Sequence, residues 1–495
     1  LCEKMHLLWL AILSTVVMLA MSCGSATMVI DCVLTPDICG PGGECDAETR
    51  QCRRKAGSPC VSSEQCAQDD RPVCNGAICV ACDVLSTPES ADQACQQKNQ
   101  KGVAACLRAG IRKGSCGECR LDAHCGDGSR PICDPSTFTC RACQKHSECT
   151  DSQVCNLGGG LVDLPDIKVG QCVPVSKVVF VDADRCPRSG SGPTGSADKP
   201  YCEISSALGK ADFVVVRPRT SGLYGGLSVS DGKRTTIVGP GRDAMTPVQV
   251  AALSVSGSQT ALVVSDITVR GDSVGASCGK DGNLWVLRSI VQNGAVGIEA
   301  LGCNRLVIEQ SIVSGNRSLG LRIGTGTRQY RIVNNVFSGN GQSVGGFGVF
   351  VAAGVSGLLS FNTILNNGEK GVDGGAIRCE TGGMTTRTVA NSIIIQNAMS
   401  ARTDGSGQPL GTQFSGDCRL NRIVVGIDGT VVVPPSEGLI RAIPDLDQSM
   451  RLLSTPNNRM YVIDKGVADD SVRNDHFGSS RPKGDGYDLG AHELR

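Results

Sequence analysis

The residues best suited to chemistry in the second half of the chain are spaced by roughly one unit of a sequence repeat. Each follows a Gly or Ala and an aliphatic residue: Glu299, Arg322, Phe350 and Arg378. Guanidinium groups bind carboxylates through paired hydrogen bonds, so the two arginines indicate a site for an acidic glycan. Asp373 and Glu380 lie close by in the sequence and extend the candidate ligand stripe. The alternative interpretation is a solvated surface without a ligand, because charged residues normally cover the outside of a protein.

Cleavage of a polysaccharide would need a different set of residues. Glycosidases hold two carboxylates close together across the scissile bond, and the carboxylates of this stripe lack such pairing. After residue 176 the chain has only two histidines, His476 and His492, both near the C-terminus. We therefore assign no catalytic residue and no metal-binding residue.

A six-residue pattern indicates the elements that must position the stripe. It occurs at residues 266–271, 289–294, 311–316, 335–340, 362–367 and 392–397, with starts 23, 22, 24, 27 and 30 residues apart. Short β-rich runs at this period are typical of a parallel β-solenoid with three strands per turn. The C-terminal two thirds is therefore predicted to be an all-β solenoid.

Stacking the turns in register makes two specific predictions. The third hexamer position should form an inward apolar stack of Val291, Val313, Phe337, Ile364 and Ile394. The sixth position should form a ladder at a turn, with Asn316, Asn340, Asn367 and Asn397 one above another. Asn tolerates a left-handed backbone, and its amide can bond the next Asn. We therefore expect a positive φ at the ladder positions.

The first third of the chain is dominated by cysteine. Between Cys32 and Cys172 lie 20 of the 28 cysteines, in five consecutive sets of four. Units of about 25 residues bury too little apolar surface to fold alone, so we expect two disulfides in each unit. Zinc is the alternative, because C-x2-C recurs at 79/82, 116/119 and 140/143. In each case, however, the first Cys closes one set and the second opens the next. The connectivity within a set stays open, since four cysteines allow three pairings.

The N-terminus has the pattern of an export signal. Residues 7–21 form an uncharged apolar run of a length that suits a signal peptide better than a membrane span. The run leads into Cys23 in a sequence that resembles a bacterial lipobox, so Cys23 is a candidate lipidation site. Ordinary cleavage that releases a soluble protein is the alternative. The predicted organisation is a signal peptide at 1–23, Cys-rich repeats at 24–176 and the β-helix at 177–495.

Two resemblances add to this interpretation. The Cys-rich string is similar to small repeats in exported proteins of myxobacteria and other Gram-negative bacteria, some of them lipoproteins, where it acts as a spacer. Residues 178–183, 198–202, 214–218 and 236–239 resemble the opening of pectin-lyase-like proteins, and residues 488–493 resemble a terminus common in bacterial surface β-helix proteins. This resemblance implies a right-handed parallel β-helix (solenoid). Within it, three disulfide pairs are expected: Cys186–Cys202, Cys278–Cys303 and Cys379–Cys418.

The expected function is binding or structural, at the cell surface. We expect an exported protein, either an outer-membrane lipoprotein or secreted, with polysaccharide or cell-envelope components as partners. The alternative is a polysaccharide lyase or another carbohydrate-active enzyme of the pectin-lyase-like fold. No cofactor is expected, and Ca²⁺ would be expected only for a lyase. Lys plus Arg equals Asp plus Glu at 48 each, which argues against nucleic acid as a partner. Contact with a membrane is expected only through a lipid anchor.

Overall fold

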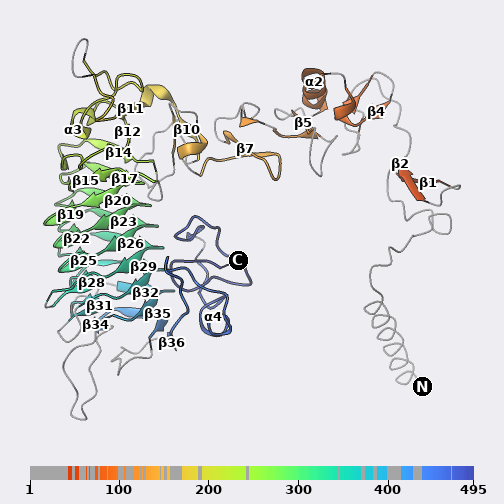
Figure 1. Cartoon of the computed structure of the whole chain (residues 1–495). Coiled ribbons are helices and arrows are strands. Elements are labelled where there is room, and N and C mark those ends of the chain that lie inside the picture. The colour runs from red at the N-terminus through yellow and green to blue at the C-terminus, as the bar shows by residue number, and fades with distance from the viewer. Residues whose placement is uncertain are drawn as a thin grey trace, which may run out of the picture. The chain divides into compact units, whose positions relative to one another are not determined.

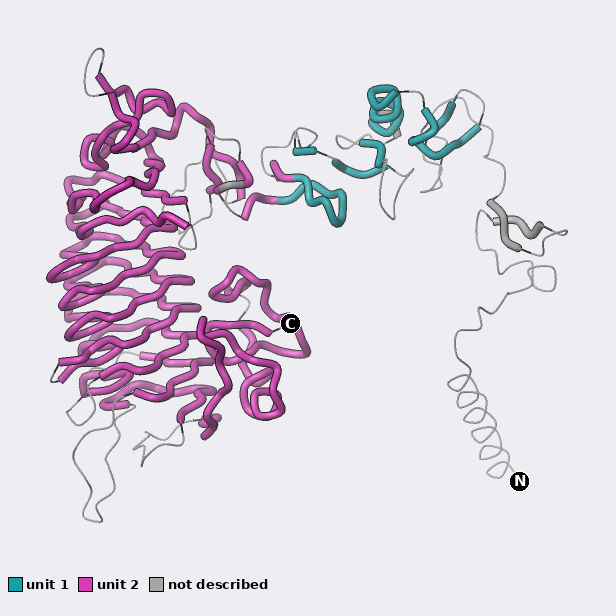
Figure 2. The backbone as a smooth tube through the Cα atoms, in the orientation of Figure 1, with its two compact units in different colours: residues 1–126, 133–141 teal, residues 127–132, 142–495 magenta. Residues whose placement is uncertain are grey.

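The computed structural model describes residues 43–46, 51–54 and 63–494, except for 64–65, 67–72, 76–77, 86, 99–104, 108–115, 120, 123–124, 126–129, 145, 150–152, 157–169, 188–191, 241–244, 344, 369–373, 383–386, 398–413, 427–436 and 470. The chain divides into two compact units (Figure 2). One comprises residues 1–126 and 133–141, and the other comprises residues 127–132 and 142–495. The second unit contains the stripe.

The second unit is a parallel β-helix, as the repeat predicts (Figure 1). One turn runs through β20 (Asn283–Leu287), β21 (Ile290–Gln292) and β22 (Val296–Ala300). Each of these strands pairs in parallel with its equivalent one turn later, as β20 does with β23 (Arg305–Glu309). Val and Ile dominate the strands because branched side chains suit a pleated, buried surface.

Two sheets make up the walls of the β-helix. One has eight strands: β13 (Leu227–Val229), β16 (Leu253–Val255), β19 (Val274–Cys278), β22, β25 (Leu319–Ile323), β28 (Phe347–Val351), β31 (Gly375–Cys379) and β34 (Phe414–Gly416). The other has 18 strands and bends at a corner, which gives two further faces. Its first face contains β11 (Val178–Val181), β12 (Phe213–Val216), β14 (Arg234–Val238), β17 (Ala261–Ser265), β20, β23, β26 (Gln329–Val333), β29 (Ser356–Ser360), β32 (Arg387–Ala390), β35 (Arg419–Val425) and β36 (Glu437–Arg441). Its second face contains β15 (Gln249–Val250), β18 (Thr268–Arg270), β21, β24 (Ile312–Ser314), β27 (Val336–Ser338), β30 (Thr363–Leu365) and β33 (Ile393–Ile395). A short helix, α3 (Ile204–Ala207), lies between β11 and β12, and another, α4 (Pro456–Tyr461), follows β36.

The inward stack is confirmed. The third hexamer positions are register neighbours in successive turns, and all are fully buried: Val291, Val313, Phe337, Ile364 and Ile394. The start of the first hexamer was wrong by one residue. Val269, not Thr268, pairs with Val291, so that repeat begins at Ile267.

The Asn ladder is also confirmed, but its predicted backbone is wrong. Asn316, Asn340, Asn367 and Asn397 are buried and bonded in series. The positive φ angles lie one residue earlier, at Asn293, Gly315, Gly339, Asn366 and Gln396. The two features are adjacent because the turn residue projects outward, whereas the next residue must direct its amide inward. Thus Asn340 Nδ2 reaches the main-chain oxygen of Val313 at 2.7 Å.

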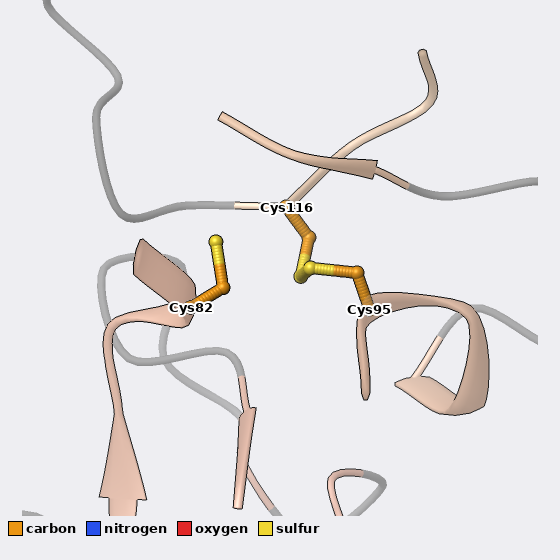
Figure 3. A group of neighbouring side chains, drawn as sticks. All are labelled: Cys82, Cys95 and Cys116. Carbon is orange, nitrogen blue, oxygen red and sulfur yellow. A yellow bond between two sulfur atoms is a disulfide. The ribbon is translucent and has the colours of Figure 1, made fainter. Parts of the chain in front are cut away.

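The Cys-rich repeats have the disulfides that their sequence predicts, in one recurring connectivity. In three complete sets the first Cys pairs with the third and the second with the fourth: Cys82–Cys106 and Cys95–Cys116, Cys119–Cys133 and Cys125–Cys140, Cys143–Cys155 and Cys149–Cys172. Figure 3 shows Cys82 beside the Cys95–Cys116 disulfide, and these three sulfur atoms lie within 4.8 Å of one another. Cys79 pairs with Cys66 and not with Cys82. The C-x2-C spacing is therefore a junction between repeats.

Short strands and helical segments precede the β-helix in the described residues. They are β1 (Gly43–Asp46), β2 (Gln51–Arg54), β3 (Val73–Cys74), β4 (Cys79–Val80), η3 (Cys82–Val84), α2 (Pro88–Lys98), β5 (Ala105–Cys106), β6 (Cys116–Gly117), β7 (Ile132–Asp134), β8 (Thr139–Arg141), η5 (His146–Glu148), β9 (Val154–Cys155), β10 (Cys172–Val173) and η6 (Val175–Lys177). The last repeat packs on the first turn of the β-helix, where Val154 and Val173 join a buried cluster with Val178, Phe180 and Phe213.

The segment after β36 folds back beside the later turns (Figure 1). Its main chain donates from Gly490 N to Asn391 O at 2.8 Å and from Ala491 N to Thr363 Oγ1 at 3.1 Å. Leu489 and Ala491 are buried in one cluster with Val336, Leu365 and Ile393 on the second face of the 18-stranded sheet. The segment therefore covers apolar side chains that would otherwise face solvent.

A buried ion pair holds this C-terminal segment together. Arg481 Nη1 lies 2.9 Å from Glu493 Oε2, and both side chains are almost fully buried. Arg481 also donates to the main-chain oxygens of Asp488 and Gly490. Burial raises the pKa of Glu493, while the Arg481 guanidinium opposes that rise. Residues 488–493 thus have a structural role, because their contacts with Arg481 hold the C-terminal segment in place.

Candidate functional site

The strand register of the eight-stranded sheet places the four central stripe residues in one column. Glu299 is the partner of Arg322, Arg322 of Phe350, and Phe350 of Arg378. On each strand the two flanking residues, such as Ile298 and Ala300, are buried in the core. Because side chains alternate along a strand, the four stripe residues point outward.

Two interactions organise the stripe. Arg322 Nη1 lies 3.0 Å from Glu299 Oε1, with side chains 45% and 18% exposed. The Arg378 guanidinium lies over two aromatic rings, 5.8 Å from the centre of Phe347 and 5.9 Å from that of Phe350. A cation within about 6 Å of a ring is attracted to its electron-rich face. Among the described residues, Arg378 has no acidic partner at ion-pair distance.

An apolar column, which the sequence analysis missed, lies beside the stripe. Val296, Leu319 and Phe347 are register neighbours on β22, β25 and β28. Each immediately precedes the Gly of a Gly–aliphatic pair, and that position was the available signal. The sheet therefore has an apolar column next to the stripe, partly exposed at Val296 and Leu319 and buried at Phe347.

The column of the stripe itself continues with serines in both directions along the axis of the β-helix. Ser277 precedes Glu299 in register, Ser254 precedes Ser277, and Ser415 follows Arg378. Ser254 and Ser277 donate their hydroxyls to main-chain oxygens of the preceding turn. Small polar side chains therefore flank the stripe along the axis of the β-helix.

The other predicted residues fall into three groups. Glu380 follows β31 and accepts a hydrogen bond from the main-chain nitrogen of Ala353 at 3.2 Å. Asp373 and Cys23 lie outside the described residues. The expected cysteine pairs are joined as disulfides in the structure: Cys186–Cys202, Cys278–Cys303 and Cys379–Cys418.

A second polar cluster fastens the last Cys-rich repeat to the β-helix. His146 Nε2 lies 3.2 Å from Asp266 Oδ2, and Arg288 Nη2 lies 2.8 Å from the same oxygen. Burial alone would raise the pKa of Asp266, but the Arg288 guanidinium and the His146 ring hold it well below its usual range. All three side chains are mostly buried. We call this cluster the latch, and its role is structural.

The two other histidines of the β-helix unit contact main-chain atoms through their rings. His476 Nδ1 lies 3.0 Å from the main-chain oxygen of Asn334, and His492 Nδ1 accepts from the main-chain nitrogen of Leu452 at 2.9 Å. Burial lowers the pKa of His492, while Asp475 opposes that change. In the described parts of the chain, the groups of three or more possible metal ligands are three cysteine triplets, whose members are disulfide-bonded.

The three faces of the β-helix differ in what lies against them. The latch residue Asp266 and the corner residue Asn334 contact the last Cys-rich repeat and the C-terminal segment, respectively. Both belong to the corner that joins the two faces of the 18-stranded sheet. The eight-stranded sheet lies away from the C-terminal segment (Figure 1), and Arg322 and Arg378 on it are exposed.

Comparison with known proteins supports the fold. No curated protein matches the chain. None of the helices that the structure describes has the length and apolar character needed to cross a membrane. Residues 246–393 match the family of the right handed beta helix region. This range includes Glu299, Arg322, Phe350 and Arg378. Together with the parallel register of the strands, the match shows that the chain contains a right-handed parallel β-helix.

Proposed function

We propose that this chain is an exported cell-surface protein that binds polysaccharide on the outer face of the eight-stranded sheet. The observation that carries the proposal is the outward column Glu299–Arg322–Phe350–Arg378, whose members are consecutive in strand register. Its two arginines are exposed, and it lies beside the apolar column of Val296, Leu319 and Phe347.

The chemistry of the column suits sugars. A pyranose has an apolar face of C–H groups and a polar edge of hydroxyl or acid groups. Aromatic rings such as Phe350 offer apolar area for the first, and guanidinium groups offer paired donors for the second. The Arg378 guanidinium lies over the rings of Phe347 and Phe350, and this contact keeps its N–H donors close to the Phe350 ring.

The partners of the stripe carboxylates favour binding of a polysaccharide over its cleavage. Glu299 is held by Arg322, and Glu380 accepts from the Ala353 main chain. Glycoside hydrolysis needs two carboxylates that both face the scissile bond. The two described carboxylates of the stripe instead hold protein groups.

Export is supported by the disulfides, which persist in oxidising compartments. The apolar run at 7–21 and Cys23 support a lipid anchor at the outer membrane. The resemblances to pectin-lyase-like proteins and to the Cys-rich repeats of exported myxobacterial proteins agree with this location. In this proposal the Cys-rich repeats form the spacer that connects the anchored N-terminus to the β-helix.

A glycan array probed with the purified chain tests the proposal. We expect retention on acidic glycans that weakens as salt rises, because salt screens exposed charges. Phe350→Ala should reduce the amount of bound glycan relative to the wild type at the same salt concentration. An array without any bound glycan would favour a passive envelope spacer, and release of cleaved product from polyuronic acids would favour a lyase.

A further inference from the structure

The spacing of the stripe charges carries information about the ligand. Neighbouring strands of a sheet lie about 4.8 Å apart. Arg322 and Arg378 are separated by the strand of Phe350, which places them roughly 10 Å apart along the axis. One sugar of an extended polysaccharide is about as long as one strand spacing. The two guanidinium groups therefore match acid groups that are two sugars apart.

The residues on the alternate strands disfavour an acid group. Phe350 lies between the two arginines and presents an aromatic ring, which suits a neutral sugar. Glu299 lies one strand before Arg322, and its carboxylate, 18% exposed, pairs with the Arg322 guanidinium at 3.0 Å. A ligand acid group at that strand would meet a like charge, which is a common means of rejecting wrong partners. Along the column the pattern is thus acidic, basic, aromatic and basic.

We infer that the stripe recognises a polysaccharide that carries one acid group on every second sugar and lies along the axis of the β-helix. This inference rests on the proposed function and specifies its ligand class. The two arginines bind the acid groups of alternate sugars. Phe350 contacts the neutral sugar between them, and Glu299 selects against an acid group on the sugar before them.

Titration calorimetry on the full chain with two hexasaccharides tests the inference. In a hyaluronan hexasaccharide uronate alternates with a neutral sugar, whereas in hexagalacturonate every sugar carries a carboxylate. We expect hyaluronan to bind with a Kd at least tenfold lower. In Glu299→Gln this difference in Kd should narrow. The substitution frees Arg322 for both ligands, but only hexagalacturonate also gains from the loss of a like charge. The matched control is Glu309→Gln, since Glu309 pairs with Arg331 at 3.0 Å on the other sheet. This control should leave the difference in Kd unchanged.

The outcomes separate the inference from the proposed function. Equal binding of the two hexasaccharides, or tighter binding of hexagalacturonate, would overturn the alternation while the proposed function stands if binding still requires Arg378. The role of Glu299 would be overturned if Glu299→Gln and Glu309→Gln both left the difference in Kd between the two hexasaccharides unchanged. Absence of binding to either hexasaccharide, together with an empty glycan array, would overturn both proposals.

Discussion

Asn340 donates from its side-chain amide to the side-chain oxygen of Asn367 one turn later, at 2.9 Å, and both residues are fully buried. Asn340 also accepts from the main chain and side chain of Asn316 and donates to Val313 O. A buried amide thus links three successive turns. The ladder explains why a solenoid with few aromatic residues keeps its turns in register.

The ladder predicts a large difference between two adjacent positions. Asn367→Ala deletes the buried amide and leaves its partners unsatisfied, so the free energy of unfolding should fall by about 2–4 kcal/mol. Asn366→Ala changes the exposed turn residue with φ 54° and should cost about 1 kcal/mol. Thermal denaturation of both variants measures the difference. Equal losses would show that the turn backbone, and not the amide ladder, stabilises this corner.

Much of this fold could be predicted because equivalent positions in successive turns have the same burial and the same hydrogen-bond partners. The burial of Val291 and Phe337 and the linkage of Asn340 follow from one period. The first hexamer failed because Asp266 has the polar character of a hexamer start, while the register assigns that position to Ile267.

Other features could not be predicted from the repeat. The contact between His146 and Asp266 joins residues 120 positions apart, and it depends on how the last Cys-rich repeat docks. Cysteine spacing alone allows three pairings in each set. The contribution of Phe347 to the stripe depends on the ring contact with Arg378, which a column assigned from spacing does not include.

Disulfide mapping tests the connectivity of the repeats. Proteolysis of the unreduced chain followed by mass spectrometry should recover Cys119 linked to Cys133 and Cys125 linked to Cys140. Thiol counting on denatured, unreduced protein should find almost no free thiol. Bound zinc with free thiols would contradict the disulfide assignment, and a Cys119–Cys125 link would contradict the recurring pattern.

The latch predicts a dependence of stability on pH. The pKa of Asp266 is lower in the folded state than in the unfolded chain. Its contribution is therefore present above the ordinary Asp pKa of about 4 and is lost as the pH falls toward the folded value. Asp266→Asn should lower the free energy of unfolding at pH 7 by about 1–3 kcal/mol. The difference from the wild type should shrink at pH 3.

The exposed Asp272 provides the control for the latch. Asp272→Asn should leave the thermal midpoint near that of the wild type at both pH values. A difference between wild type and Asp266→Asn that stays constant from pH 7 to pH 3 would show that the carboxylate charge is not what fastens the repeat.

The proposed anchor makes a separate prediction. In a Gram-negative host the wild-type chain should partition with the outer membrane, and Cys23→Ala should move it to the soluble fraction, because one Cys carries the lipid. Ser22→Ala leaves the acceptor thiol in place and should not release the chain. Unchanged partitioning of Cys23→Ala would favour ordinary signal cleavage.

The most direct test of polysaccharide binding by the stripe is a calorimetric titration of hyaluronan into the wild type and the double variant Arg322→Gln/Arg378→Gln. Charge-assisted hydrogen bonds contribute about 1.5–3 kcal/mol each, and each 1.4 kcal/mol is about tenfold in Kd. We therefore predict a loss of about 100-fold or more. Arg328→Gln, at a 67% exposed arginine outside the stripe, should bind as the wild type does. Wild-type affinity in the double variant would contradict the assignment of this face as the binding site.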